Sequence, residues 1–124
     1  MSYDIELVDP VTGLVLQLDE PHHMHGGTYA VGGTSEASLN VTYNYEEHFF
    51  REFPYNFVSG LWGLRSLYGM TGAHSLPVLK AAIDQLGNDT DPDYWKPTEG
   101  NAKRALIQLQ AMASMRPDGV WKGD

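Results

Sequence analysis

The sequence contains no cysteine. Disulfide bonds, thiolate metal sites, iron–sulfur clusters and cysteine nucleophiles are therefore excluded. It also contains no run of about eighteen apolar residues, the length that crosses a membrane. Its first ten residues carry three acids and no base, which is not typical of a signal peptide. We therefore expect a cytoplasmic protein that has no contact with a membrane.

Basic residues are scarce in the first half of the chain. Residues 1–60 hold nine acids and one base, Arg51, and sum to −8, whereas residues 61–124 hold seven acids and seven bases and sum to zero. An acidic surface repels phosphate groups, so we expect no direct binding to nucleic acids. Such a surface favours docking on a protein with a basic surface, although it also serves solubility alone.

Catalytic motifs are missing as well. No serine stands in a G-x-S-x-G turn, no H-E-x-x-H pattern occurs, and the carboxylates have no apolar surroundings that would raise a pKa for general acid catalysis. We expect no catalytic residue and no cofactor, with a small hydrolase or transferase as the weaker alternative.

Alternation of apolar and polar residues predicts strands near 3–8, 14–19 and 38–45. Asp9-Pro10 and Gly13 between the first two are typical of a hairpin turn. Helical spacing predicts helices near 76–86, capped by Ser75, and 99–115, capped by Thr98. Residues 46–53 fit a short helix or an irregular extension, and residues 58–68 show helical spacing interrupted by two glycines. One α+β domain over residues 1–124 is expected, with an antiparallel sheet packed against helices.

The segment "HHMHGGTYAVGGT" at residues 22–34 allows three interpretations. As a phosphate loop it has glycine where the lysine belongs, and a strand follows it in place of a helix. As a metal site, His23 and His25 share one side of an extended segment with His22 beside them, yet a further ligand (Glu20, His48 or His74) stands at no recognisable spacing. We expect no metal. The third interpretation is a flap, or else a plain connection, with hinges at Gly26, Gly27, Gly32 and Gly33.

The candidate binding residues combine this flap with polar and aromatic groups from later segments. We predict that Tyr29 closes over Asn44 from the third strand and over Asn101 and Arg104 from the first turns of the last helix. Trp95 and Arg116 are further candidates, because aromatic residues and arginine are common in interfaces and pockets. Trp95 and Trp121 also fit a simpler role as covers for the ends of the helical core.

Three stretches carry a resemblance to a known group of proteins: "GGTYAVGGTSEASLNVTYNY", "LYGMTGAHSLPVLKAAIDQLGND" and "DYWKPTEGNAKRALIQL" with "MRPDGVWKGD". They resemble small, mostly uncharacterised proteins of bacteriophages, prophages and other mobile elements of bacteria. The resemblance implies no defined activity. It implies an accessory protein that acts inside a bacterial cell by binding host proteins or by sequestering signalling molecules.

The sequence therefore favours a non-enzymatic accessory protein that binds a host protein through its acidic half and inhibits a nucleic-acid-binding or defence protein. The alternative is a protein that binds or sequesters a small, nucleotide-like molecule, using the Asn and Thr side chains of the third strand beneath the glycine-rich segment. The sequence does not determine the oligomeric state.

Overall fold

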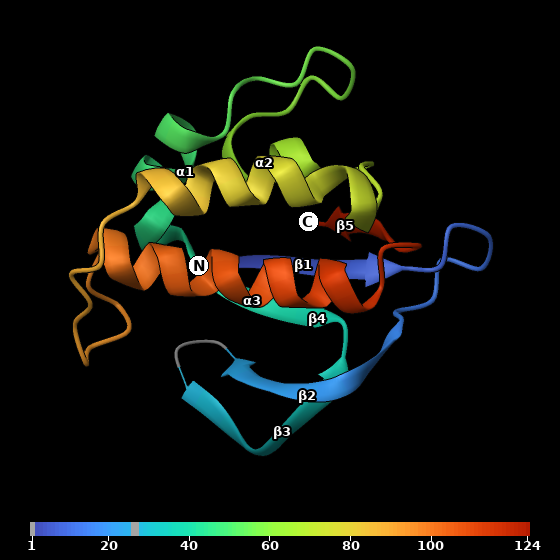
Figure 1. Cartoon of the computed structure of the whole chain (residues 1–124), viewed down its shortest axis with the longest axis horizontal. Helices are drawn as coiled ribbons and strands as arrows, with labels where there is room; N and C mark the ends of the chain where they lie inside the picture. The colour runs from blue at the N-terminus through green and yellow to red at the C-terminus, as the bar shows by residue number, and fades with distance from the viewer. Residues whose placement is uncertain (1, 26–27) are drawn as a thin grey trace.

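The computed structural model of the protein describes residues 2–25 and 28–124, and the side chains of residues 23–33 lie outside this description. A three-stranded antiparallel sheet with the order β4-β1-β5 forms one layer (Figure 1). β1 (Ser2–Val8) is central, between β4 (Ser38–Thr42) and β5 (Val120–Gly123). The apolar residues of β1 are buried, and on its polar face Asn40 Nδ2 donates to Asp4 Oδ1 at 2.6 Å.

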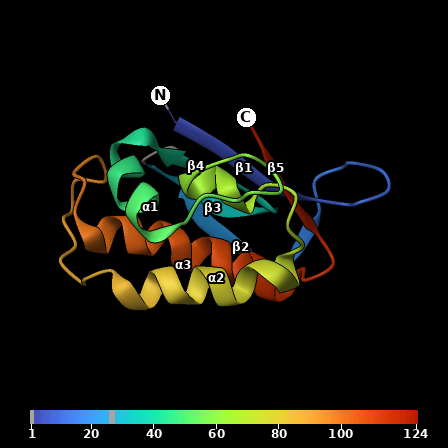
Figure 2. The same ribbon diagram turned by 90° about the horizontal axis from the view of Figure 1, so that it is seen from above.

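Two long helices form the second layer (Figure 2). α2 (Gly72–Gln85) packs against α3 (Glu99–Met115), and α3 has the predicted bounds, with Thr98 Oγ1 accepting from Asn101 N at 3.1 Å. The buried stripe of α3 joins the apolar face of the sheet in one core. It consists of Ala102, Ala105, Leu106, Leu109, Met112 and Ala113. The predicted α+β architecture, an antiparallel sheet with helices, is confirmed.

The predicted hairpin between residues 3–8 and 14–19 is wrong beyond its turn. The turn forms, with Gly13 at φ 73° and Gly13 N donating to Asp9 O at 2.8 Å. The pairing continues past the bridge between Val8 and Val15 only to Leu16, whose N donates to Leu7 O at 3.0 Å. Ala37 then inserts between the strands: Leu7 N donates to Ala37 O at 2.8 Å, and Ala37 N donates to Leu16 O at 2.9 Å. One edge of β1 is then occupied by β4, so the second strand must pair elsewhere.

The second strand forms a separate ribbon. β2 (Gln17–His25) pairs in antiparallel fashion with β3 (Thr28–Glu36), and this two-stranded sheet lies beyond β4 in Figure 1. The ribbon is irregular, with register shifts between the pairs at Gln17, His22 and Met24. Most of the glycine-rich segment is therefore strand.

The third predicted strand is shorter than expected. β4 ends at Thr42, whose hydroxyl accepts from Asn44 N at 3.1 Å and starts a 3₁₀ turn, η1 (Tyr43–Tyr45). A side-chain acceptor that captures the backbone in this way ends the ladder. α1 (Glu46–Glu52) follows, so the short-helix alternative for residues 46–53 is the observed one.

Ser75 does not cap the helix near 76–86, which begins one turn earlier with Thr71 as its cap. The serine is fully buried, where its Oγ donates to Gly72 O at 2.8 Å and accepts from Trp121 Nε1 at 2.7 Å. Trp121 belongs to β5, a strand that the sequence pattern did not reveal because it is only four residues long.

Residues 58–68 do not form the helical turns that their spacing suggests. Only Gly63–Leu67 (η2) is helical, as a 3₁₀ segment, and Gly60 and Gly63 both have positive φ, at 74° and 60°. A right-handed helix has negative φ throughout, so no helix continues across Gly60, and Gly63 stands only at the very start of η2. In the described part of the chain, no helix combines the length and apolar character that a membrane span requires.

Candidate functional site

The clearest candidate site is the connection between α1 and η2, residues 54–62, which we call the aromatic loop. Asn56 organises it. Its Oδ1 accepts from Val58 N at 2.9 Å and Ser59 N at 3.2 Å, and its Nδ2 donates to Ser66 O at 3.0 Å. The backbone of Asn56 also accepts from Gly60 N at 2.8 Å and donates to Leu61 O at 3.0 Å. One residue thus closes the turn and anchors it to η2.

The aromatic loop presents apolar side chains to water. Phe57 is 89% exposed, Val58 99% and Trp62 65%, although the turn that carries them is hydrogen-bonded. Tyr55 stands between two of them, with its ring centroid 4.8 Å from that of Phe57 and 5.1 Å from that of Trp62, both edge-on. The rings therefore support one another in an ordered cluster that the folded core does not use.

Phe50 of α1 extends this cluster. Its ring packs on the backbone of Gly63, where a Cβ would stand 2.6 Å from the ring, and it remains 50% exposed. A whole aromatic side chain has an area of about 150 to 250 Å². With their exposed fractions, the side chains of Phe50, Tyr55, Phe57 and Trp62 together leave on the order of 500 Å² in water. The largest apolar patch of a monomer covers about 300 to 600 Å² and is often functional.

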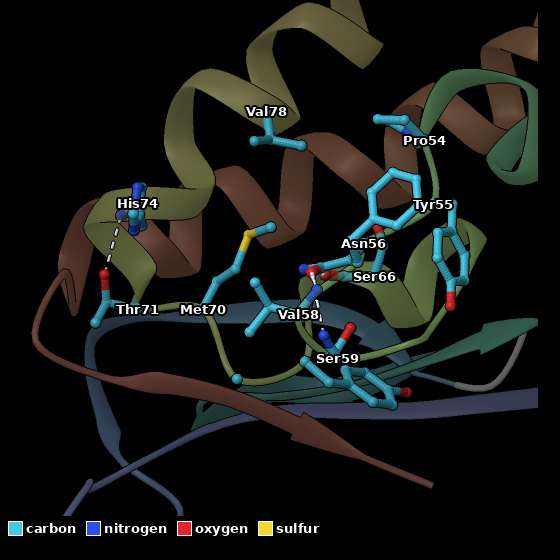
Figure 3. A pocket seen from close by; sticks show the side chains of 13 residues that line it. Pro54, Tyr55, Asn56, Val58, Ser59, Ser66, Met70, Thr71, His74 and Val78 are labelled. Carbon is cyan, nitrogen blue, oxygen red and sulfur yellow. Dashed lines mark hydrogen bonds between the residues drawn. The ribbon is translucent and has the colours of Figure 1, made fainter.

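An apolar cleft lies beside the aromatic loop (Figure 3). Its volume is about 730 Å³, and it is bounded by the loop, by the end of η2 and by the first turns of α2. The side chains of Met70 and Val78 face Val58 across it, with Thr71 and His74 at one end. No carboxylate, lysine or arginine is among the described residues that line it.

Tyr68 is a buried polar feature of the cleft lining. Its hydroxyl is shielded from water and has no hydrogen-bond partner among the described residues. Burial, reinforced by the nearby charge of Asp124, raises the pKa of Tyr68 to about 12. The phenol therefore stays neutral at physiological pH and adds no charge to the cleft.

The sequence-predicted site residues lie elsewhere. Asn44 Nδ2 donates to Trp95 O at 2.8 Å, and Trp95 is 48% exposed, with its ring against Tyr94. Asn101 is 1% exposed: its Oδ1 accepts from Asp91 N at 3.0 Å and its Nδ2 donates to two carbonyls of the same connection. The structure thus brings Asn44, Trp95 and Asn101 to the connection between α2 and α3, where both amides bond to backbone.

The two predicted arginines lie at opposite ends of α3. Arg104 lines a hollow of about 110 Å³ near the start of the helix, together with Lys103. Arg116, just after the helix, pairs with Asp118 at 2.8 Å and donates to Gln17 O at 3.1 Å. At 1.5 Å per residue the two lie roughly 18 Å apart along the axis. Arg116 therefore lies far from Arg104, which stands one turn after Asn101 on the same helix. The side chain of Tyr29, which was predicted to close over Asn44, Asn101 and Arg104, lies outside the described side chains, so this grouping stays a prediction.

The flap and metal hypotheses fall mainly on residues without a described side chain. Gly26 and Gly27 lie outside the described residues, and so do the side chains of Tyr29, His23 and His25; Gly32 and Gly33 belong to β3. His22 is buried, with Nε2 3.1 Å from Glu36 O. Among the described residues no group of three or more His, Asp or Glu could hold a metal ion.

Sequence reasoning missed the aromatic loop because it read residues 58–68 as weak helix. A signal was present in "FPYNFVSGLWG": an asparagine with serine and glycine three and four positions later is typical of a turn, and the residues around it are aromatic or aliphatic. Apolar residues on such a turn have no place in the core.

Comparison with protein-family models, with curated proteins and with solved structures finds no match to this chain.

Proposed function

We propose that this protein is a non-enzymatic binding protein that docks on another protein through the aromatic loop. One observation carries the proposal: Phe57 and Val58 are almost fully exposed on a turn that Asn56 holds in place. Exposing apolar side chains costs about 1.5 to 3 kcal/mol each relative to burial. An ordered loop that keeps them in water is typical of a binding surface, in which rigid aromatic residues lose little entropy on binding.

The expected setting is part of the proposal. An accessory protein of a bacteriophage or mobile element would use this surface against a host protein, and inhibition of a nucleic-acid-binding or defence protein is one such use. The acids of residues 1–60 support docking on a basic partner. They are distributed over β1, the turn at Asp9, the β2–β3 ribbon and α1.

The test is quantitative capture of host proteins on the immobilised chain. We expect a protein that binds the wild type and is lost from the double variant Phe57→Ser, Val58→Ser. The matched control is Val11→Ser, Leu14→Ser, because these residues are 91% and 69% exposed on a different turn. Circular dichroism must show that both variants fold. Capture of the same proteins by all three chains would refute the proposal.

A small-molecule ligand is the second candidate. The cleft volume of about 730 Å³ lies within the about 300 to 1,000 Å³ of known ligand pockets, and its lining is mainly apolar with a few polar groups. Native mass spectrometry of the purified protein would detect such a ligand. A bound small molecule that Met70→Ala or Val78→Ala releases would favour this function over protein docking.

A further inference from the structure

We infer that the partner segment at the aromatic loop is basic and amphipathic: a short stretch whose apolar side chains cover Phe57, Val58 and Trp62 and whose lysines or arginines face α1. This inference rests on the proposed function and names the chemistry of the partner. It comes from the way in which the aromatic loop continues onto one face of α1.

Phe50 connects the two surfaces. Its ring packs on Gly63, next to Trp62 of the loop. On α1 itself, Glu46 and Glu47 stand four and three residues before Phe50 and are exposed. Residues at these spacings are neighbours on one helix face, about 5 to 6 Å apart. The acidic pair therefore borders the aromatic cluster directly.

Both carboxylates of this pair are exposed, and the charge of Glu47 helps to raise the pKa of Arg51 on the same helix. Arg51 is the basic residue of α1, and its guanidinium is held by Glu52 at 2.9 Å and by Glu99 at 3.2 Å. Neither Glu46 nor Glu47 forms an ion pair with any residue that the structure describes. Two exposed carboxylates without an ion-pair contact beside an apolar patch match a segment that carries its own basic residues close to its apolar ones.

Charge also argues against a second copy of this chain as the occupant. Each copy carries a net charge of −8, and an interface between identical patches would hold the Glu46 and Glu47 carboxylates of both copies. Like charges that face each other across an interface are unfavourable. The same Glu46–Glu47 pair attracts a basic segment, so it favours that occupant over a second copy.

The test is selection of random twelve-residue peptides on the immobilised full-length protein, with removal of those that also bind the Phe57→Ser, Val58→Ser variant. We expect the remaining peptides to combine apolar residues with a net positive charge. Their binding should weaken about 3- to 10-fold in Glu46→Gln, Glu47→Gln, because exposed ion pairs contribute modestly. Raising NaCl from about 0.05 to about 0.5 M should weaken binding to the wild type and have less effect on this variant.

The control variant is Asp19→Asn, Glu20→Gln on β2, which removes the same charge from exposed positions outside α1. It should bind these peptides within about twofold of the wild type, because the Debye length is about 10 Å at 0.1 M salt. Equal weakening in both double variants would show that net charge alone acts, and it would overturn the inference.

Other results separate this inference from the proposed function. Loop-dependent peptides that are neutral or acidic would overturn the inference and leave docking through the aromatic loop intact. Failure to select any loop-dependent peptide, together with unchanged capture by the Phe57→Ser, Val58→Ser variant, would overturn both. Sedimentation that shows a dimer in the wild type and a monomer in that variant would identify a second copy as the occupant and overturn the inference.

Discussion

Asn56→Ala should release the aromatic loop from the body of the protein. The change removes three hydrogen bonds: two from Val58 N and Ser59 N to Oδ1, and one from Nδ2 to Ser66 O. Val58 and Ser59 are exposed, so their freed amides bond to water and each loss costs about 0.5 to 1 kcal/mol. Ser66 is 3% exposed, and its carbonyl loses the Nδ2 donor at a cost nearer the upper end of that range.

Together these losses should lower the free energy of unfolding by about 2 kcal/mol, which corresponds to a fall in Tm of roughly 7 °C for a chain of this size. Urea unfolding and calorimetry measure both values. Hydrogen exchange gives the local effect: the amides of Val58, Ser59 and Gly60 should lose protection, because all three donate to Asn56. Binding to a loop-dependent partner should weaken as the loop loses its fixed geometry.

Ser59→Ala is the matched control within the same loop. It removes one exposed hydrogen bond, from Leu61 N to Ser59 Oγ at 3.3 Å, and should change stability by less than about 0.5 kcal/mol. The role of Asn56 is contradicted if Asn56→Ala leaves the exchange of the Val58 and Ser59 amides unchanged, or if the two variants are equally stable. In either case something other than Asn56 orders the aromatic loop.

Two further predictions concern the core. Ser75→Ala should lower the free energy of unfolding by about 2 kcal/mol, because it leaves the buried Trp121 Nε1 without its 2.7 Å acceptor. In urea unfolding, Trp121→Phe should destabilise the Ser75→Ala protein less than it destabilises the wild type. Equal destabilisation by Trp121→Phe in both proteins would contradict the contact. Burial raises the pKa values of Tyr3 and Tyr68 to about 12, whereas an unfolded tyrosine ionises near 10. The folded state therefore holds more protons between pH 10 and 12, so stability should fall as pH rises through this window, and Tyr68→Phe should lessen the fall; an identical pH profile in that variant would show that Tyr68 does not contribute.

Local signals account for the parts of the fold that the sequence predicted well. α3 has an N-cap at Thr98, an acid in its first turn and an apolar stripe with helical spacing, and all three lie within seventeen consecutive residues. The turn at Asp9 to Gly13 is equally local, because Asp9 Oδ1 accepts from Val11 N and Thr12 N within the turn itself. Such features need no information from distant segments.

The incorrect predictions involve competition between segments. The strand after the turn shows the right alternation for a hairpin, but β4 occupies the edge of β1 that this strand would have used. Ser75 has the composition of a cap, but the indole of Trp121, forty-six residues later, binds its hydroxyl in the core. A sequence pattern gives the preference of one segment and does not show which segments compete for the same partner.

The candidate site shows the same difference between features that local sequence sets and features that depend on contacts between distant segments. The turn at Asn56 and Gly60 follows from local sequence, because turn chemistry and composition are local, although the sequence analysis did not identify it. That these residues stay in water depends on the tertiary structure: the core is filled by other elements, β1, β4, α2, α3 and Trp121 among them, and Phe57 and Val58 lie outside it, beside the open cleft. The tertiary structure also placed Phe50 on Gly63, and so joined the acidic face of α1 to the aromatic loop, because that contact depends on how α1 packs against η2.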